Sequence, residues 1–273
     1  MDDNHGTAVL GVIGADDNDL GVTGISPESF IRLAAFSMPT ATVIDQAAAL
    51  LGPGDILLLE IQRRGPRATG NGQEGYIAIE WWPDDFAAIQ AAVQRGVIVV
   101  EAGGNGAENL DDPAYDTPAP GFPPDWKNPF NRSVVDSGAI IVGAGAPPPG
   151  THGADWGIDR SRLNFSNYGS CIDVQGWGRE VTTTGYGDLQ GGPNPDVWYS
   201  NTFSGTSSAS PIIVGTIACL QGILRARHST LLNPGQVRRL LRNTGSPQQD
   251  TPNRPATQRI GNRPDLRAIV LEL

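Results

Sequence analysis

Residues 205–211 read Gly-Thr-Ser-Ser-Ala-Ser-Pro, and the apolar run Ile-Ile-Val-Gly-Thr-Ile-Ala follows at residues 212–218. A glycine, a cluster of hydroxyls and a proline before such a run predict a sharp turn that opens a helix. We place Pro211 in the first helical turn, where its missing N–H costs little. A serine here lies at the positive end of the helix dipole, which suits a nucleophile whose attack creates an oxyanion. The alternative is a helix that Ser or Thr merely caps.

Two further patterns share this mixture of small and polar residues. Residues 4–15 read Asn-His-Gly-Thr-Ala-Val-Leu-Gly-Val-Ile-Gly-Ala, which places His5 at the mouth of a predicted helix. Residues 97–106 read Val-Ile-Val-Val-Glu-Ala-Gly-Gly-Asn-Gly, which predicts a strand that ends in a glycine-rich loop. Taken alone, His5 is a capping or packing histidine, and Asn105 is a turn asparagine among glycines.

In this order the three patterns resemble the subtilisin family of serine peptidases. That family has HGTHVAG around its general base, where this chain has HGTAVLG, and GTSMASP around its nucleophile, where this chain has GTSSASP. The pattern at 97–106 resembles the strand and loop of the family's oxyanion-hole asparagine. The resemblance extends from Asn4 to the predicted helix near residues 237–241. It implies Ser207 as nucleophile, His5 as general base and Asn105 as oxyanion donor, together with the Ser207 backbone N–H.

The resemblance also implies a catalytic aspartate some tens of residues before the histidine. Here the histidine is residue 5, so Asp2 and Asp3 are too near it in sequence to take that place, and we expect them to cap the helix. We interpret residues 1–273 as a single subtilisin-like peptidase domain that lacks the N-terminal segment with the acid. The chain as given should then be a weak or inactive peptidase. The alternative is a degenerate member of the family.

The leading functional hypothesis is a serine endopeptidase that acts on polypeptides through an acyl-enzyme on Ser207. Two alternatives fit the same resemblance, namely a non-catalytic peptide-binding protein and an acyl-transfer macrocyclase. Retention of His5, Asn105 and Ser207 together favours an enzyme. This chemistry requires no cofactor, and the resemblance alone favours secretion.

The substrate-binding strand implied by the resemblance is the apolar run at residues 55–61. Family members usually carry Ser-Leu-Gly-Gly at its end, where this chain has Glu-Ile-Gln-Arg at 60–63. Main-chain pairing with a peptide survives most side-chain changes. The candidate substrate-binding residues are therefore Glu60, Ile61, Gln62, Ala102, Gly103 and Gly104.

Three acids, Glu60, Glu80 and Glu101, lie at or near the ends of predicted strands. A carboxylate in an otherwise apolar strand, such as Glu101, needs a partner. One interpretation is an acidic pocket that binds a Lys or Arg side chain of the substrate. The other is internal pairing with Arg63, Arg64 or another base.

A metal site is a further expectation from the resemblance. Residues 16–22 read Asp-Asp-Asn-Asp-Leu-Gly-Val, and in many family members the loop at this point binds calcium. Oxygen ligands of this kind suit Ca²⁺. The matching ligands are the Asn18 side chain and the carbonyls of Asp16, Leu20 and Val22. The alternative is a solvated acidic turn.

The composition fits one large α/β domain, with 39% hydrophobic and 18% charged residues among 273. Apolar runs alternate with helical patterns, which predicts a three-layer α/β sandwich, a mostly parallel sheet with helices on both faces. We expect strands at 30–36, 55–61, 97–101 and 139–143 and another after 166–174. We expect helices at 5–15, 42–51 and 84–95, from Ser207 to about Arg225, and at 233–243.

Charge, apolar runs and cysteine content bear on nucleic-acid binding, membrane spans and disulfides, respectively. A net charge of −10 argues against nucleic-acid binding, which needs a basic face. No run of about 18 apolar residues is present, so we expect no transmembrane helix. Cys171 and Cys219 are too few for a disulfide scaffold, and they form either one bridge or two buried thiols.

Overall fold

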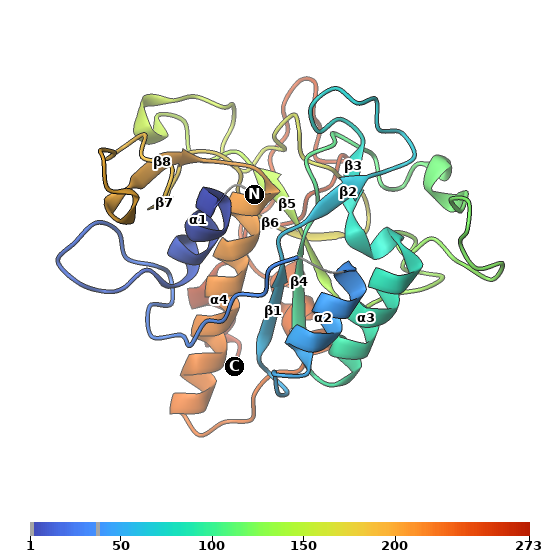
Figure 1. Ribbon diagram of the computed structural model, residues 1–273, viewed down its shortest axis with the longest axis horizontal. Coiled ribbons are helices and arrows are strands. Elements are labelled where there is room, and N and C mark those ends of the chain that lie inside the picture. Colours follow the sequence, from blue (N-terminus) through green and yellow to red (C-terminus); the bar gives the residue numbers. More distant parts are fainter. Residues whose placement is uncertain (1–2, 37–38) are drawn as a thin grey trace.

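A parallel four-stranded sheet forms the centre of the computed structural model, which describes residues 3–36 and 39–273 (Figure 1). The strand order is β1–β4–β5–β6, and each neighbouring pair is parallel. The carboxyl ends of all four strands therefore meet at one edge of the sheet. The strands span Ile56–Leu59 (β1), Ile98–Ala102 (β4), Ile140–Gly145 (β5) and Ile172–Trp177 (β6).

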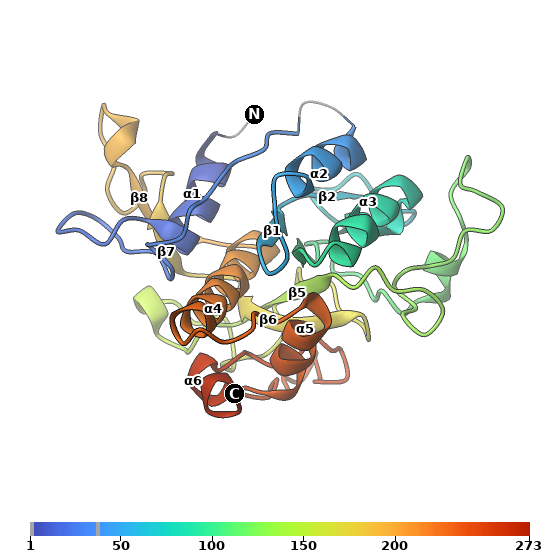
Figure 2. The ribbon, with the colours of Figure 1, turned by 90° about the horizontal axis from the view of Figure 1, so that it is seen from below.

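Helices cover both faces of this sheet (Figure 2). One face carries α2 and α3, and the other carries α4 and α5, with α1 and α6 packed against α4. The expected three-layer α/β sandwich is therefore confirmed. The helices span Asp3–Gly14 (α1), Thr40–Ala48 (α2), Pro83–Gln94 (α3), Thr206–Ala226 (α4), Pro234–Asn243 (α5) and Leu266–Leu271 (α6).

The apolar run before Glu101 is buried on both faces of the sheet. Side chains alternate along a strand, so neighbouring residues point to opposite layers. Ile98 and Val100 belong to the core beneath α4, whereas Val97 and Val99 belong to the core beneath α2 and α3. This two-sided burial explains why four consecutive positions are apolar, as is typical of parallel sheets.

The predicted strand at 30–36 is wrong. The segment has no regular structure, and within the described ranges no strand pairs with it. Its side chains are largely in solvent, since Phe30 is 86% and Leu33 71% exposed. A run of apolar or β-branched residues does not form a strand where no neighbouring strand pairs with its backbone N–H and C=O groups.

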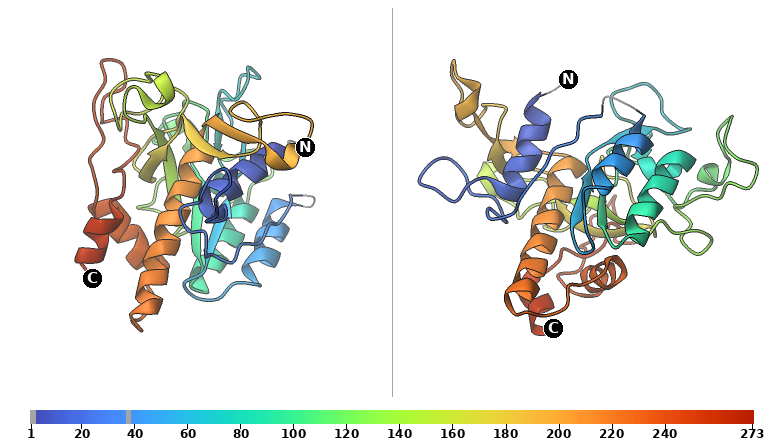
Figure 3. Two further views of the ribbon diagram at one scale, coloured as in Figure 1. Left: turned by 90° about the vertical axis from the view of Figure 1, so that its left-hand side faces the viewer. Right: turned by 60° about the horizontal axis from the view of Figure 1, so that its bottom comes forward.

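Two antiparallel hairpins are the main elements that the sequence did not predict. The first pairs β2 with β3, and the second pairs β7 with β8. The second hairpin packs against α1 and is coloured yellow to orange beside the dark blue helix in Figure 3. The spans are Gln62–Arg64 (β2), Tyr76–Ala78 (β3), Val181–Thr184 (β7) and Tyr199–Phe203 (β8), with short 3₁₀ helices at Ile79–Trp81, Pro113–Asp116, Thr151–Gly153 and Pro195–Val197.

Helix α4 is the central helix of the fold. By length and composition alone it could cross a membrane, because its mean hydropathy is 1.5. Yet 61% of its most apolar 18-residue stretch is buried, and α4 packs against β4, β5 and β6. Its role as a core helix accounts for its composition, and the expected absence of a membrane span stays a prediction.

Both cysteines are free thiols. Cys171 is buried in the core, whereas Cys219 is half-buried and its Sγ lies 3.3 Å from the carbonyl oxygen of Ile25. Of the two alternatives from the sequence, the disulfide bridge is therefore not formed.

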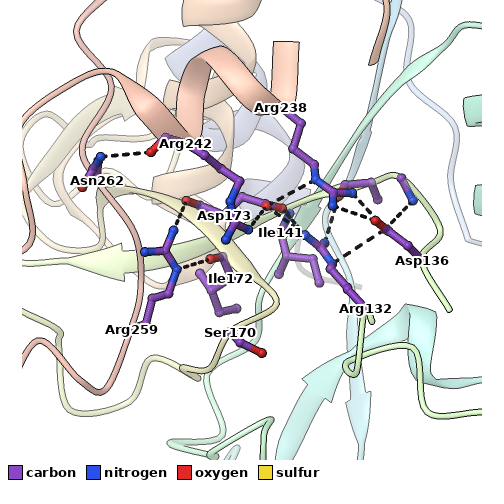
Figure 4. Close-up of polar contacts among 12 residues, drawn as sticks. Arg132, Asp136, Ile141, Ser170, Ile172, Asp173, Arg238, Arg242, Arg259 and Asn262 are labelled. Atoms are coloured by element: carbon purple, nitrogen blue, oxygen red, sulfur yellow. Dashed lines mark hydrogen bonds and ion pairs between the residues drawn. The ribbon is translucent and has the colours of Figure 1, made fainter. Parts of the chain in front are cut away.

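A buried carboxylate on β6 joins the sheet to α5 and to the long loop before β5 (Figure 4). Asp173 is fully buried and accepts hydrogen bonds from Arg132 at 2.8 Å, Arg242 at 2.6 Å and the Ile141 N–H at 2.9 Å. Arg238 lies 3.5 Å from the same carboxylate and also bonds Asp136. One anion thus holds guanidinium groups from two separate segments.

Loss of the Asp173 carboxylate should destabilise the fold strongly. In an Asp173→Ala variant, Arg132 and Arg242 lose the anion that balances their partly buried charges. Removing one partner of a buried ion pair costs about 3–5 kcal/mol. We expect a decrease of this size in the free energy of unfolding in urea. Asp125→Ala, the same change at an exposed position, is the control, and equal midpoints for the two variants would contradict this account.

Candidate active site

A cleft of about 780 Å³ opens at the carboxyl edge of the sheet. Side chains from opposite ends of the chain line it, and His5, Asn105 and Ser207 are all among them. The other lining residues are Glu60, Ile61, Gln62, Gln73, Glu74, Tyr76, Ala102, Ala107, Asn164, Phe165, Arg179, Ser204, Gly205 and Thr206.

The turn before α4 places Ser207 at the start of that helix. Gly205 precedes the helix with φ at +104°, a left-handed conformation that favours glycine. Ser207 is the second residue of α4, so its N–H is one of the four that a helix start leaves without an internal partner. The partial positive charge of this end favours an anion beside Ser207.

Pro211 lies deeper in α4 than the sequence predicted. The helix begins at Thr206, which places Pro211 in the second turn rather than the first. Its missing N–H leaves the Ser207 carbonyl without the donor that a helix normally supplies four residues later. Side chains support this turn instead, since Ser208 Oγ donates to the Trp177 carbonyl and Ser210 Oγ to the Thr206 carbonyl, both at 2.9 Å.

Asn105 bridges the loop after β4 and the turn before α4. Its Oδ1 accepts hydrogen bonds from the Thr206 N–H at 2.8 Å and from Thr206 Oγ1 at 3.0 Å. Its Nδ2 donates to Gln73 Oε1 at 3.0 Å, and its backbone N–H donates to Gln62 Oε1 at 2.7 Å. The Asn105 amide is thus oriented by Thr206, with its donor end in the cleft.

His5 is held beside the same turn by aromatic packing. Its ring packs edge-on against Phe203, with centroids 5.9 Å apart and an interplanar angle of 75°. Phe203 ends β8, two residues before Gly205, and it stacks in turn on Tyr186. The expectation that Asp2 and Asp3 cap α1 concerns side chains outside the part of the chain that the structure describes.

Glu60 brings an acid from the end of β1 to the first turns of α4. Ser210 Oγ hydrogen-bonds to Glu60 Oε1, whereas Glu60 Oε2 is buried without a hydrogen-bond partner. Removal from water raises the pKa of Glu60 to about 8, and the nearby hydroxyls of Ser210 and Ser207 oppose only part of that rise. The Glu60 carboxyl is therefore largely protonated at neutral pH.

The expected acidic pocket of three carboxylates is wrong, because Glu80 and Glu101 lie away from the cleft. Both are fully buried, and Glu101 Oε1 accepts the Glu80 N–H at 3.0 Å. Burial, followed by the charge of Glu80, raises the pKa of Glu101 well above its usual value. Burial raises the pKa of Glu80 to about 7, although Arg132 opposes the rise.

The two arginines that the sequence offered as partners for these acids bind elsewhere. Arg63 pairs with Asp85 at 2.8 Å, and Arg64 Nε donates to Tyr76 Oη at 2.8 Å. Arg63 and Arg64 are therefore not the partners of Glu80 and Glu101, but the charge of another internal base, Arg132, does act on Glu80, in line with the second interpretation.

The candidate substrate-binding residues divide into two groups. Glu60, Ile61, Gln62 and Ala102 line the cleft, whereas the two glycines do not. A Cβ on Gly103 would lie 2.7 Å from the Val142 carbonyl oxygen, and one on Gly104 would lie 2.5 Å from Asn167 Nδ2 and 3.1 Å from the Tyr76 carbonyl oxygen. These glycines therefore make room for the chain itself, and their assignment to substrate stays a prediction.

The β2–β3 hairpin supplies cleft residues that the sequence analysis missed. Gln73, Glu74 and Tyr76 come from this hairpin, which is joined to the Asn105 loop by a Gly75 N–H to Gly106 carbonyl bond of 3.1 Å. The signal was the Gly-Asn-Gly turn at residues 70–72, which is typical of hairpins. Arg179, Phe165, Asn164 and Ala107 were missed without any comparable motif.

The proposed calcium loop forms a local turn. Asn18 Oδ1 accepts the Leu20 N–H at 2.8 Å, and the Asn18 N–H donates to the Asp16 carbonyl at 3.1 Å. Such bonds are typical of an asparagine turn. The described residues contain no group of three or more His, Cys, Asp or Glu side chains suited to a metal ion. This finding concerns side chains of these four types, so the calcium site at Asp16, Asn18, Leu20 and Val22 stays a prediction beside the solvated turn.

Known proteins resemble this chain both in sequence and in fold. The model of the subtilase family matches residues 63–261. Subtilisin Savinase from Lederbergia lenta is 25% identical over 247 residues, which cover 89% of this chain and 70% of that protein. An extracellular protease from Xanthomonas campestris pv. campestris is 30% identical over 158 residues, which cover 58% of this chain but only 21% of that protein.

Solved structures share the fold over nearly the whole chain. The PatG macrocyclase domain aligns with a TM-score of 0.64 and 18% identity over 98% of this chain and 67% of that one. A cold-adapted subtilisin-like serine proteinase aligns with a TM-score of 0.54 and 21% identity over 95% of this chain and 72% of that one. At these identities the likeness shows the fold alone.

The buried pair Glu80 and Glu101 should make stability fall as pH rises. A carboxyl whose pKa is raised in the folded state contributes fully at a pH below its unfolded value of about 4.5. That contribution is lost as pH rises through the folded pKa, which is about 7 for Glu80. Glu101→Gln keeps an acceptor for the Glu80 N–H but cannot ionise. We expect the variant to unfold at a higher urea concentration than the parent at pH 8, with a smaller difference at pH 5. A constant difference would contradict this assignment.

Proposed function

Because this chain belongs to the subtilase family, we propose that it is a serine endopeptidase that forms an acyl-enzyme on Ser207. The observation that carries the proposal is the gathering of His5, Asn105 and Ser207 around one cleft. Nucleophile, base and oxyanion donor must share one site for acyl transfer to proceed. The subtilase resemblance supplies the role of each.

Attack and proton transfer involve two side chains. Ser207 Oγ attacks the scissile carbonyl, and His5 accepts the hydroxyl proton as the new C–O bond forms. His5 then donates that proton to the leaving amine as the C–N bond breaks. Water repeats the sequence on the acyl-enzyme and releases the carboxylic acid product. No step in this cycle requires a cofactor.

The oxyanion is stabilised by donors that the fold already holds in place. The Ser207 N–H belongs to the open start of α4, and Asn105 Nδ2 reaches the cleft from the β4 loop. In the structure Asn105 Nδ2 donates to the side-chain oxygen of Gln73, an exposed hairpin residue. The substrate oxyanion would replace this oxygen, since both are acceptors for the same N–H.

The substrate is a polypeptide bound along the wall formed by Glu60, Ile61, Gln62 and Ala102. Backbone groups at the end of β1 are suited to pair with an extended peptide. The proposed steps do not involve calcium.

Turnover of an activated ester and a peptide amide by the chain tests the proposal. Ser207→Ala should abolish turnover of both. Asn105→Ala should lower kcat by about 10²–10³-fold, the measured cost of the same oxyanion donor in subtilisin, a member of this family. Ser229→Ala, an exposed serine in a loop after α4, should have no effect.

Product masses separate the alternatives. A free acid shows hydrolysis, and a product joined to an added amine shows acyl transfer. Peptide binding without turnover of either substrate would instead identify a non-catalytic binding protein.

Glu60 should set an alkaline limit to this activity. Its carboxyl is neutral below about pH 8 and ionises above it. A carboxylate beside Ser207 opposes the negative charge that develops on the oxyanion. We therefore expect kcat/KM for the ester to fall as pH rises through about 8, and Glu60→Gln to abolish that fall. The other titratable groups of the cleft are His5, Glu74, Tyr76 and Arg179. If the pH profiles of kcat/KM were parallel for the parent and Glu60→Gln, one of these groups rather than Glu60 would cause the fall.

A further inference from the structure

Arg179 is fixed in the wall of the cleft by two aromatic rings. It lies between β6 and β7, and its guanidinium carbon is 4.4 Å from the Trp156 ring centroid and 5.1 Å from that of Phe165. Both distances are within the range of attractive cation–π contacts. Trp156 is itself oriented, because its Nε1 donates to Glu180 Oε1 at 2.9 Å. The Arg179 side chain is therefore held in place before any ligand arrives.

The charge of Arg179 has no anionic partner in the described part of the molecule. Its Nε is buried without a hydrogen-bond partner, and no carboxylate lies within 4.0 Å of its nitrogens. The nearest acid in sequence, Glu180, accepts the Trp156 bond instead. Burial lowers the pKa of Arg179, and the charge of Glu180 opposes the shift.

Other partly buried arginines of the chain have partners. Arg162 Nη1 donates to the carbonyl oxygens of Leu163, Asn164 and Ser166. Arg263 donates to Asp159 at 2.6 Å, and Arg238 donates to Asp136 at 2.7 Å. Polar groups out of water are normally hydrogen-bonded, because an unpaired buried charge costs free energy. The Nε atoms of Arg132 and Arg263 are also unpaired, but other nitrogens of those two arginines are bonded. Arg179 has no bonded nitrogen among the described residues, so its donors are left for an acceptor that comes from outside the chain.

We propose that Arg179 is a specificity-determining residue that binds a carboxylate of the polypeptide substrate, from an Asp or Glu side chain or from the C-terminus. The inference rests on the proposed peptidase function, since Arg179 lines the same cleft as Ser207. A guanidinium offers planar paired donors that match a carboxylate in a two-point contact. In a protein with a net charge of −10, which repels acidic peptides at long range, a local cation is needed to hold one.

Glu60 and Glu74 are the acids that share the cleft with Arg179. Glu60 is largely protonated at neutral pH and so adds little repulsion, and Glu74 is an exposed hairpin residue that bonds Thr69. An unbranched apolar side chain can occupy the same place between the two rings, although without the cation–π attraction. Arg179→Met therefore keeps much of the contact with Trp156 and Phe165 while it removes every donor.

The test measures peptide binding to the inactive Ser207→Ala chain by fluorescence anisotropy. The probes are labelled hexapeptides in matched pairs that differ only in Glu or Gln at one position, with a free or an amidated C-terminus. Hydrogen bonds to a charged group contribute about 1.5–3 kcal/mol. We expect replacement of the bound carboxylate by an amide to weaken binding about 10–150-fold. The Glu–Gln pairs and the C-terminal pairs show which carboxylate is bound.

Arg179→Met in the same background should erase this discrimination, and Arg179→Lys should restore part of it. Arg225→Met, an exposed arginine on α4, is the matched control and should discriminate as the parent does. The proposal is overturned if no pair shows a preference for the carboxylate, or if Arg179→Met keeps the preference. If circular dichroism shows that Arg179→Met does not fold, Arg179→Lys becomes the test. It keeps the charge but loses the two-point contact, so it should show a smaller preference for the carboxylate than the parent, and an equal preference would overturn the proposal.

The two proposals fail in different ways. A carboxylate preference in the Ser207→Ala background without any turnover by the parent chain would contradict the peptidase and leave the role of Arg179 intact. Turnover by the parent with equal binding of all matched pairs would contradict the role of Arg179 alone.

Discussion

The hydrogen bonds between Asn105 and Thr206 connect the two halves of the site. One half follows a central strand and the other opens the central helix, and 101 residues separate them in sequence. Asn105 Oδ1 accepts both donors of Thr206, which leaves the amide nitrogen as the end that faces the cleft. The Gly104 N–H adds a third bond to Thr206 Oγ1 at 3.2 Å. The proposed oxyanion donor is useful only if its position is fixed before the charge develops, and these bonds fix the Asn105 amide.

The alternation of apolar runs with helical patterns predicted the layers, and short motifs pointed to the three catalytic candidates. A glycine with φ at +104° and a helix start at Thr206 are local features, so Gly-Thr-Ser is informative on its own. The strand at 30–36 failed for the opposite reason. A strand depends on a neighbour, and residue pattern says nothing about whether one is present.

The alternation of side chains along a strand predicts the face of the sheet to which the Glu101 side chain points. Val100 faces α4, so its neighbour Glu101 must face the α2–α3 layer, where it is paired in register with Leu59. The next residue after Leu59, Glu60, then faces α4 and meets Ser210. No such rule identifies Arg179, because its proposed role rests on the lack of an anionic partner among the described residues. That lack becomes visible only when the positions of the neighbouring acids are known.

The central claim, that Ser207 is a nucleophile activated by His5, is tested most directly by covalent labelling. The chain is treated at neutral pH with a fluorophosphonate, digested and mapped by mass spectrometry. The account predicts one adduct, on Ser207, and its loss in a His5→Ala variant that keeps its circular dichroism spectrum. An adduct on Ser204, Ser208 or Ser210 instead, or labelling of Ser207 that is unchanged in His5→Ala, would contradict it.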